Sequence, residues 1–229
     1  MISGASAGAA RLHRVQSIRD VSPSAYVLRL SREGLVFRPG QWINLGVPGS
    51  RERREYTIYS ASEEDCIEVL IKEIAEGTVS RELRRCRPGD SLEVKGPHGA
   101  FLIDERAQAR GRFLFIATGA GVSPFHCFTR SYRGLDYLLL HGVRAAGELY
   151  DRESFDPERF IPCISQGGEM ENGIGRVYHG RLTSYLRENP VEPSRFCSLC
   201  GNSDMIYEAY AILRGYGVRP SRILAEVYF

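Results

Sequence analysis

The first half of the chain alternates short apolar runs with turn residues. Runs rich in β-branched and aromatic residues predict strands, and such runs lie at 24–30, 41–47, 54–60, 66–74 and 90–96. Turn-forming pairs separate them, at Pro39-Gly40, Pro88-Gly89 and Gly96-Pro97. One helix is expected over 79–86. Several short strands at this spacing predict a small antiparallel barrel or sandwich.

The pattern changes after Gly111. The runs 112–118 and 136–143 are mostly apolar and predict strands buried on both faces, and 160–165 and 194–201 predict further strands. Helical spacing with a glycine stop covers 203–217. Alternating strands and helices predict a parallel sheet covered on both faces.

The expected fold class is therefore β + α/β, an antiparallel β-barrel followed by a Rossmann-like parallel α/β domain. The polar stretch 104–112 marks the change between them. We expect two domains, 1–108 and 109–229.

Composition excludes several functional classes. Hydrophobic residues make up 43% and charged residues 25% of the 229 residues, which is typical of a soluble globular protein. A formal charge of +2 is too small to favour nucleic acid as a partner, and the apolar runs are too short to span a membrane. The first fourteen residues are interpreted as a frayed terminus, with an organelle presequence as the alternative.

Cysteine usage points to the cytoplasm and away from metal. The six cysteines are dispersed in mostly apolar surroundings, which indicates reduced thiols. The single CxxC at 197–200 has no second pair, and no iron–sulfur spacing occurs. We therefore expect no metal site in this chain.

Four groups of residues carry candidate chemistry, and the first is Arg54-x-Tyr56-Thr57-x-x-Ser60. Strand alternation places Arg54, Tyr56, Ile58 and Ser60 on one face. A phenol ring there can stack on a planar heterocycle, and a guanidinium two residues away can pair with a phosphate. The alternative is an exposed aromatic–arginine ladder on a barrel.

The second group is the stretch 77–83, Gly-Thr-Val-Ser-Arg-Glu-Leu. Gly77 permits a tight turn, while Thr78 and Ser80 bring hydroxyls to a helix start. Free backbone amides in a first helical turn attract an anion. The alternative is a capped helix without a ligand.

The third group follows a predicted buried strand, where Gly119-x-Gly121 leads to Pro124 at the start of a helix. Glycines allow a ligand to approach the backbone, and the helix start favours phosphate. The alternative is a tight strand–helix turn.

The fourth group joins Cys200-Gly201 to the ending Glu226-x-Tyr228-Phe229. Cys200 is either a polarizable wall near a reacting carbon or a buried thiol. The two terminal aromatic residues suggest docking against an apolar group, with a final strand packed on the sheet as the alternative.

These motifs, in this order and with 89–101 between the second and third, resemble those of the ferredoxin–NADP reductase family of flavoproteins. The resemblance runs from about residue 12 to the last residue. It implies FAD in the barrel domain and a nicotinamide nucleotide in the second domain. It also implies the chemistry: electrons pass between NADP(H) and a one-electron carrier, with hydride transfer at flavin N5.

The resemblance assigns roles to individual residues. Arg54 would contact the FAD pyrophosphate and Tyr56 would stack on the isoalloxazine, while Thr57 stands where the family usually has serine near N5. The residues expected to bind FAD are Arg54, Tyr56, Thr57, Ser60, Leu70, Ile71, Lys72, Gly77, Thr78, Val79, Ser80, Thr118, Tyr228 and Phe229. The expected catalytic residues are Thr57, Cys200, Glu226 and Tyr228.

The same resemblance implies a nucleotide site in the second domain. Its expected residues are Gly119, Gly121, Pro124, Arg144, Arg176, Arg181 and Cys200. Ser165-Gln166 departs from the family, whose NADP-specific members commonly have Ser-Arg there. The three arginines remain available for the 2′-phosphate, and we favour NADP over NAD.

The expected partner is a separate ferredoxin or flavodoxin, and the chain is expected to act as a cytoplasmic monomer. An acidic partner could be steered by Arg51, Arg53, Arg84, Arg85 and Arg87, or these could form a solvated charged surface. Two alternatives remain: an NAD(P)H-dependent reductase component of an oxygenase or P450 system, and a non-catalytic flavin electron-transfer subunit.

Overall fold

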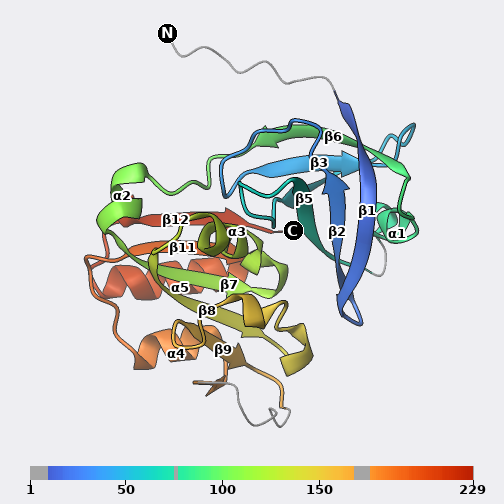
Figure 1. Cartoon of the computed structure of the whole chain (residues 1–229). Coiled ribbons are helices and arrows are strands. Elements are labelled where there is room, and N and C mark those ends of the chain that lie inside the picture. The colour runs from blue at the N-terminus through green and yellow to red at the C-terminus, as the bar shows by residue number, and fades with distance from the viewer. Residues whose placement is uncertain (1–9, 75–76, 168–175, 229) are drawn as a thin grey trace. The chain divides into compact units, whose positions relative to one another are not determined.

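The computed structural model describes residues 10–74, 77–167 and 176–228. The chain forms two compact units, Met1–Leu102 and Ile103–Phe229, each with its own sheet (Figure 1). The units divide after Leu102, a few residues ahead of the predicted boundary at 108. The assignment of 1–108 to FAD and 109–229 to the nucleotide stays a prediction.

Unit 1 is an antiparallel sheet of six strands in the order β4-β3-β6-β1-β2-β5. The strands are β1 (Arg11–Ser22), β2 (Ala25–Ser31), β3 (Trp42–Gly46), β4 (Arg54–Thr57), β5 (Cys66–Lys72) and β6 (Ser91–His98). The two edges meet where Ile58 bridges Val69 and the Tyr59 N–H donates to the Glu68 carbonyl at 2.7 Å. The sheet thereby closes on itself, and the predicted antiparallel barrel is confirmed.

Sequence patterning missed the first strand of the barrel. Along β1 only His13 and Val15 are fully buried, and a register shift between Val15 and Ser17 interrupts the alternation. A strand with so few buried positions carries too weak a signal to be recognised by its period.

The expected turn at Gly96-Pro97 was wrong. Both residues lie inside β6, and their peptide bond is cis. Gly96 has φ 136° and lies against the backbone of β3, where an added Cβ would come within 3.2 Å of the Trp42 carbonyl oxygen. The glycine therefore serves a close approach between paired strands rather than a reversal of the chain.

The strand carrying the first motif is shorter than predicted. β4 ends at Thr57, and Ile58, Tyr59 and Ser60 are all buried. The alternation that should place Ile58 and Ser60 on the face of Tyr56 stops where the chain turns to close the barrel. Ser60 instead uses its hydroxyl inside the unit, accepting from the Glu68 N–H at 3.1 Å.

Unit 2 is a parallel sheet in the order β10-β9-β8-β7-β11-β12. Its strands are β7 (Arg112–Thr118), β8 (Asp136–Val143), β9 (Phe160–Ile164), β10 (Tyr178–His179), β11 (Phe196–Gly201) and β12 (Ile223–Val227). Its helices are α2 (Glu105–Arg110), α3 (Ser123–Ser131), α4 (Leu182–Glu188) and α5 (Ser203–Gly215), while α1 (Thr78–Arg84) belongs to unit 1. The predicted parallel α/β unit is confirmed; α2, α4 and β10 were not foreseen.

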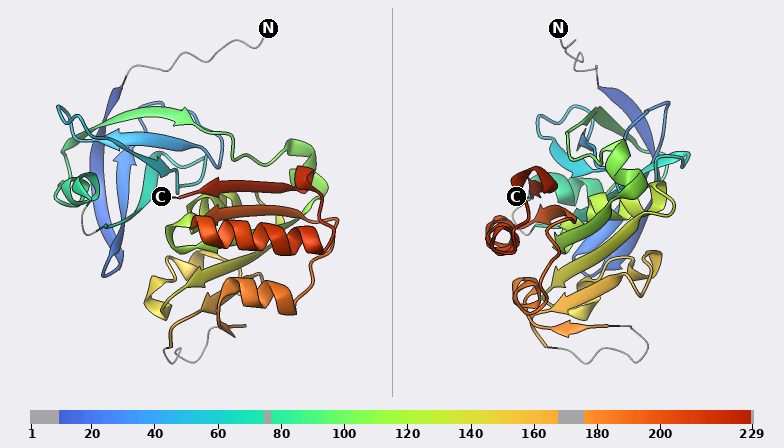
Figure 2. Two further views of the ribbon diagram at one scale, coloured as in Figure 1. Left: turned by 180° about the vertical axis from the view of Figure 1, so that it is seen from behind. Right: turned by 90° about the vertical axis from the view of Figure 1, so that its left-hand side faces the viewer.

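Helices cover both faces of this sheet (Figure 2). On one face, Leu114 and Ile116 of β7 share a buried cluster with Leu186 of α4 and Leu213 of α5. On the other, Phe115 stacks on Phe125 of α3 with ring centroids 4.7 Å apart. Burial on both faces explains why β7 reads as a continuous apolar run.

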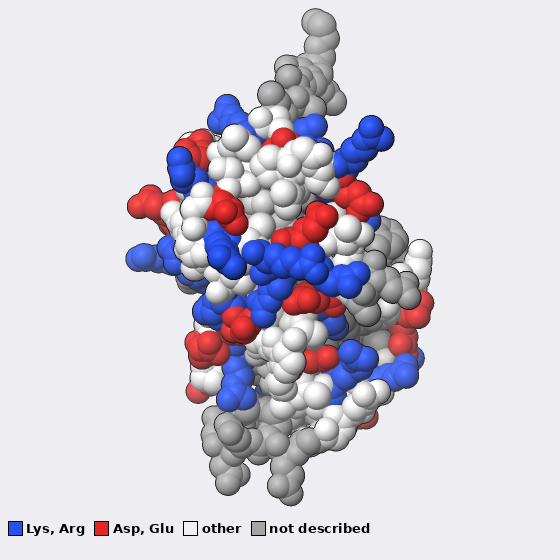
Figure 3. All heavy atoms as spheres, turned by 90° about the vertical axis from the view of Figure 1, so that its right-hand side faces the viewer, with Lys and Arg blue, Asp and Glu red and all other residues white. Residues whose placement is uncertain are grey.

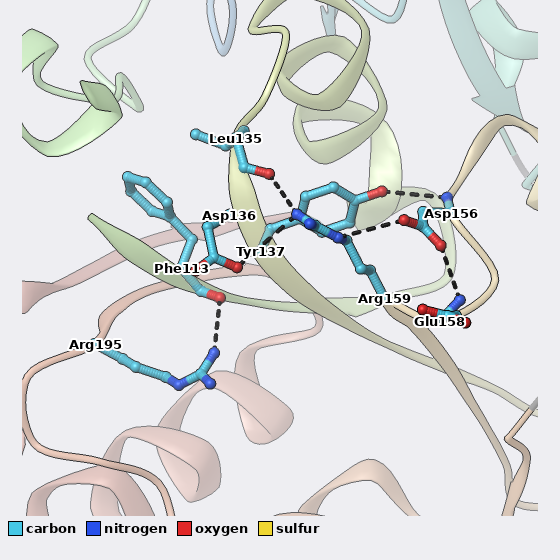
Figure 4. A network of polar contacts seen from close by, with 8 residues as sticks. All are labelled: Phe113, Leu135, Asp136, Tyr137, Asp156, Glu158, Arg159 and Arg195. Atoms are coloured by element: carbon cyan, nitrogen blue, oxygen red, sulfur yellow. Dashed lines mark hydrogen bonds and ion pairs between the residues drawn. The ribbon is translucent and has the colours of Figure 1, made fainter. Parts of the chain in front are cut away.

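A polar network secures the amino-terminal ends of the strands (Figure 4). Arg159 donates to the Leu135 carbonyl at 2.8 Å and pairs with Asp156 at 3.3 Å, with its guanidinium over the Tyr137 ring. The Tyr137 hydroxyl accepts from the Asp156 N–H at 3.3 Å. These contacts hold the amino-terminal ends of β8 and β9 together. The carboxyl ends of the strands lie at the opposite edge of the parallel sheet.

We expect Arg159→Ala to lower the free energy of unfolding by about 1 kcal/mol, because it removes a hydrogen bond to a backbone carbonyl and the half-exposed ion pairs with Asp136 and Asp156. Chemical denaturation measures this. Arg219→Ala is the control, since Arg219 is exposed and its side chain has no partner within the described ranges. Equal stability of the two variants would contradict the role of the network.

Candidate functional site

The candidate site in unit 2 lies at the carboxyl ends of β7 and β11. Thr118 ends β7, Cys200 and Gly201 end β11, and the two strands are neighbours. The strand order reverses between them, because the chain continues from β7 to β8 on one side and from β11 to β12 on the other. Open α/β sheets bind ligands outside the strand ends at such a switch point.

Two glycines let the turn after β7 pack on β11. A Cβ on Gly121 would come within 2.4 Å of the Cys200 carbonyl oxygen, and one on Gly201 (φ +131°) within 2.3 Å of the Thr118 hydroxyl oxygen. Gly119 differs, because its φ is +52° and nothing lies within 4 Å of an added Cβ. Packing therefore explains Gly121, whereas Gly119 leaves its side of the turn open.

Thr118 and Asn202 connect the turn to helix α5. The Thr118 hydroxyl oxygen accepts from the Asn202 N–H at 2.9 Å. The Asn202 side chain in turn accepts from the amides of Asp204 and Met205, capping α5. The cap uses amides that would otherwise be open to an anion, so the start of α5 is occupied by the chain itself.

Cys200 is a buried neutral thiol. Burial raises the pKa of Cys200 well above its ordinary value, and the Glu226 carboxylate acts in the same direction, while a hydrogen bond with the Tyr228 side chain opposes them. Glu226 is the register partner of Cys200 on β12, and the Tyr228 N–H donates to the Gly201 carbonyl at 2.9 Å. A thiol held neutral is a poor nucleophile but a suitable polarizable wall.

The structure thus brings together the expected Thr118, Cys200, Glu226 and Tyr228, with Gly119 and Gly121 in the adjoining turn. Pro124 lies in the first turn of α3 and is buried. Phe229 lies outside the described residues. The functional roles of these residues stay predictions.

The three expected phosphate arginines lie around the next strands. Arg144 follows β8 directly, Arg176 precedes β10, and Arg181 is at the start of α4. Arg144 is already engaged, since its N–H donates to Glu148 at 3.1 Å and its guanidinium pairs with the same carboxylate at 3.4 Å. A phosphate at Arg144 would share the guanidinium with this carboxylate.

His141 is a residue of this edge that sequence reasoning missed. It lies inside β8 with no exposed surface, and its Nε2 lies 2.9 Å from the Gly119 carbonyl oxygen. Burial lowers the pKa of His141 to about 4, against the opposing effects of that carbonyl and of Glu148. The sequence feature that could have revealed this residue is a single histidine after the apolar run 137–140.

In unit 1, Arg54 and Tyr56 lie next to each other on the exposed side of β4. Arg54 is exposed, and its guanidinium donates to the Arg53 carbonyl at 3.0 Å. Burial raises the pKa of Tyr56 to about 12, with the Arg54 guanidinium opposing it. Thr57 is buried.

Helix α1 begins at the second motif, with Gly77 as its N-cap. No side chain caps it, so the alternative of a side-chain-capped helix is not observed. Val79 and Ser80 are buried, and the Ser80 hydroxyl oxygen has no hydrogen-bond partner among the described residues. Uncapped amides and an unpaired buried oxygen are features that a bound group could satisfy.

Tyr26 connects the two candidate motifs of unit 1. Its hydroxyl donates to the Ser80 carbonyl at 2.6 Å. Burial raises the pKa of Tyr26 far above its ordinary value, and the phenol of Tyr56 acts in the same direction. Tyr26 of β2 is therefore linked to both α1 and the Tyr56 motif of β4.

The expected residues on β5 are mostly covered. Leu70 and Ile71 are buried, whereas Lys72 is half-buried. Lys72 is the one of these three whose side chain reaches solvent.

Comparison with known proteins agrees with this architecture. Residues 12–103 match the family model of the oxidoreductase FAD-binding domain. Ferredoxin–NADP reductase B of Sorangium cellulosum is 27% identical over 94% of this chain and 96% of its own length. The toluate 1,2-dioxygenase electron transfer component of Pseudomonas putida is 26% identical over 93% of this chain and 66% of its own length.

Solved structures show the same fold along the whole chain. A cytochrome P450 reductase of Amycolatopsis is 25% identical with a TM-score of 0.79, covering 98% of this chain and 72% of that one. A ferredoxin NADP⁺ reductase of Neisseria gonorrhoeae, solved with bound FAD and NADP, is 21% identical with a TM-score of 0.80 and covers 97% and 100%.

An FAD-binding barrel followed by a parallel α/β unit with a site at its switch point defines a flavoprotein oxidoreductase. The chain carries the oxidoreductase FAD-binding domain at residues 12–103, and it aligns over more than nine-tenths of its length with relatives named ferredoxin–NADP reductase, which confirms the resemblance seen in its motifs. It spans 66% and 62% of the length of two reductase components of oxygenase or demethylase systems. Within the described ranges, no helix is long and apolar enough to cross a membrane.

We expect His141 to make stability depend on pH. Its pKa is 6.5 when exposed and about 4 when folded, so the unfolded chain takes up the proton first. The part of the free energy of unfolding that depends on a neutral His141 is fully present above pH 6.5. It is lost as the pH falls toward 4, with a slope of about 1 kcal/mol per pH unit.

Urea unfolding between pH 7.5 and 4.5 measures this dependence. Other groups add their own slope, so the comparison is with His141→Gln, which cannot titrate. The variant should show the shallower dependence; equal slopes in the two proteins would contradict the assignment.

Proposed function

We propose that this chain is an FAD-dependent reductase that passes electrons between NADP(H) and a separate one-electron carrier, a ferredoxin or a flavodoxin. The observation that carries the proposal is the switch-point site of unit 2, where Thr118 and a buried neutral Cys200 meet Glu226, in a chain that also carries an FAD-binding barrel. When bound, FAD supplies the step between hydride and single-electron transfer.

The residues of unit 1 fit an FAD molecule. The exposed Arg54 guanidinium offers paired donors to a diphosphate, and the adjacent Tyr56 ring offers a stacking surface. The unpaired Ser80 hydroxyl and the uncapped amides of α1 offer further donors. Tyr26 holds α1 in place by its bond to the Ser80 carbonyl.

Each residue of the switch-point site has a distinct part in unit 2. Gly119 leaves room for the nucleotide to approach the backbone. Cys200 adds a polarizable surface without charge beside the nicotinamide, because burial keeps its thiol protonated. Glu226, its register partner, is the group placed to hold a proton or orient the ring.

The preference for NADP rests on three arginines. Arg144 follows β8, Arg176 and Arg181 flank β10, and Gln166 stands where an arginine would add a fourth positive charge. Relatives named as ferredoxin–NADP reductases support this preference.

A second candidate function has support of its own. Relatives of similar identity are named as the toluate 1,2-dioxygenase electron transfer component and as the reductase subunit of an aromatic O-demethylase. The same flavin chemistry would then serve an oxygenase or a P450.

The surface arginines differ in their availability to an acidic partner. Arg53 pairs with Glu93, and Arg84 pairs with Asp20 and Glu73. The side chains of the other three have no partner within the part of the chain described: Arg51, Arg85 and Arg87. Figure 3 shows basic side chains interspersed with acidic ones on one face.

The first test is the cofactor itself. We expect the protein, purified with added FAD, to be yellow and to be bleached by NADPH faster than by NADH, followed anaerobically at the flavin absorption band. A colourless protein that takes up no FAD would refute the proposal. Equal rates with the two nucleotides would remove the NADP preference alone.

The second test concerns the anchor of the cofactor. Arg54→Ala should weaken FAD binding by about 10- to 100-fold, because it removes charge-assisted hydrogen bonds to the diphosphate. Fluorescence titration of the apoprotein measures this. Arg51→Ala is the matched control, an exposed arginine in the preceding loop, and it should bind FAD as the wild type does; unchanged affinity in Arg54→Ala would sink the assignment.

A further inference from the structure

His141 is the one histidine of β8, and packing alone does not account for it. The side chain has no exposed surface, and its register partner on β7 is Ala117, one residue before the end of that strand. From there the ring reaches the turn that follows β7, where Nε2 lies 2.9 Å from the Gly119 carbonyl oxygen.

The direction of this hydrogen bond follows from its partner. A carbonyl oxygen only accepts, so Nε2 carries the proton and Nδ1 is left as an acceptor. Nδ1 is buried and has no hydrogen-bond partner among the described residues. A leucine would fill the same place without burying an unpaired nitrogen, so the imidazole costs stability that the bond to Gly119 must offset.

The bond determines how the peptide between Gly119 and Ala120 is oriented. In a trans peptide the carbonyl and the following N–H point in opposite directions. Because the carbonyl is held toward the buried His141, the Ala120 N–H points away from the core of the unit. Gly119 has the open side described above, and Ala120 is half-exposed.

We propose that His141 is a positioning residue, which holds the Gly119–Ala120 peptide so that the Ala120 N–H faces the bound pyridine nucleotide. The inference rests on the proposed function, since it names a determinant of the same nucleotide site. His141 touches neither nucleotide nor flavin; it acts through the turn. Thr118 and Gly121 secure the ends of that turn against α5 and β11, and His141 secures the peptide between them.

Three variants separate positioning from packing. His141→Leu removes the donor and keeps an apolar side chain, whereas His141→Gln keeps an N–H near the place of Nε2. His13→Leu is the matched control, because His13 is equally buried and also bonds a backbone carbonyl, with Nδ1 2.7 Å from the Ser31 oxygen, but belongs to unit 1.

The kinetic readout is NADPH oxidation with ferricyanide as acceptor. We expect His141→Leu to raise the KM for NADPH about five- to tenfold with kcat nearly unchanged, because one neutral hydrogen bond no longer orders the binding peptide. His141→Gln should restore the KM to within about twofold of the wild type. His13→Leu should leave it unchanged. An unaltered KM in His141→Leu, or equal damage in the glutamine variant, overturns the proposal.

Amide hydrogen exchange of the nucleotide-free protein provides a readout independent of activity. The peptide covering 118–123 should exchange faster in His141→Leu than in the wild type, and His141→Gln should match the wild type. Should His141→Leu not fold, His141→Met takes its place. If the wild type showed no NADPH oxidation, the proposed function would fall, while the exchange rates would still decide whether His141 holds the turn; equal protection in all variants would refute it.

Discussion

The backbone contact between the turn after β7 and the end of β11 sets the position of the candidate groups at the switch point of unit 2. No side chain fits between them, since a Cβ at Gly121 would collide with Cys200 and one at Gly201 with Thr118. The contact lies where the strand order reverses, so it brings the ends of two strands from different parts of the chain to one edge. Thr118, Cys200 and the register partner of Cys200 are neighbours for this reason.

Burial then determines which of these groups carry charge. It holds the Cys200 thiol protonated and His141 neutral, and in unit 1 it raises the pKa of Tyr56. The exposed groups near the candidate sites include Arg54, Arg144 and Arg176, and arginines keep their charge in any environment. The neutral Cys200 and His141 near the strand ends, with arginines beyond them, suit a ligand that has a planar ring and an anionic remainder.

The sequence predicted best where burial is uniform. β7 and β8 are covered on both faces, so their apolar runs could be recognised directly. In the barrel the pattern also located β2, β3, β5 and β6, but it failed at the irregular places. β1 shows too few buried positions, and Gly96-Pro97 serves a close approach between strands. The alternation from Arg54 to Ser60 stops at Thr57, because the chain turns there to close the barrel.

By itself, the sequence determined the order of the units, the parallel character of the second sheet and the residues of each motif, because local spacing records which faces are buried and where glycine is needed. Only the tertiary structure decided what each motif residue does. Gly121 allows close packing on β11, and the Ser60 hydroxyl forms a hydrogen bond inside the barrel. The Ser80 hydroxyl has no hydrogen-bond partner among the described residues. His141 forms a hydrogen bond with a turn more than twenty residues earlier in the chain. These outcomes depend on contacts between strands distant in sequence, which no local pattern records.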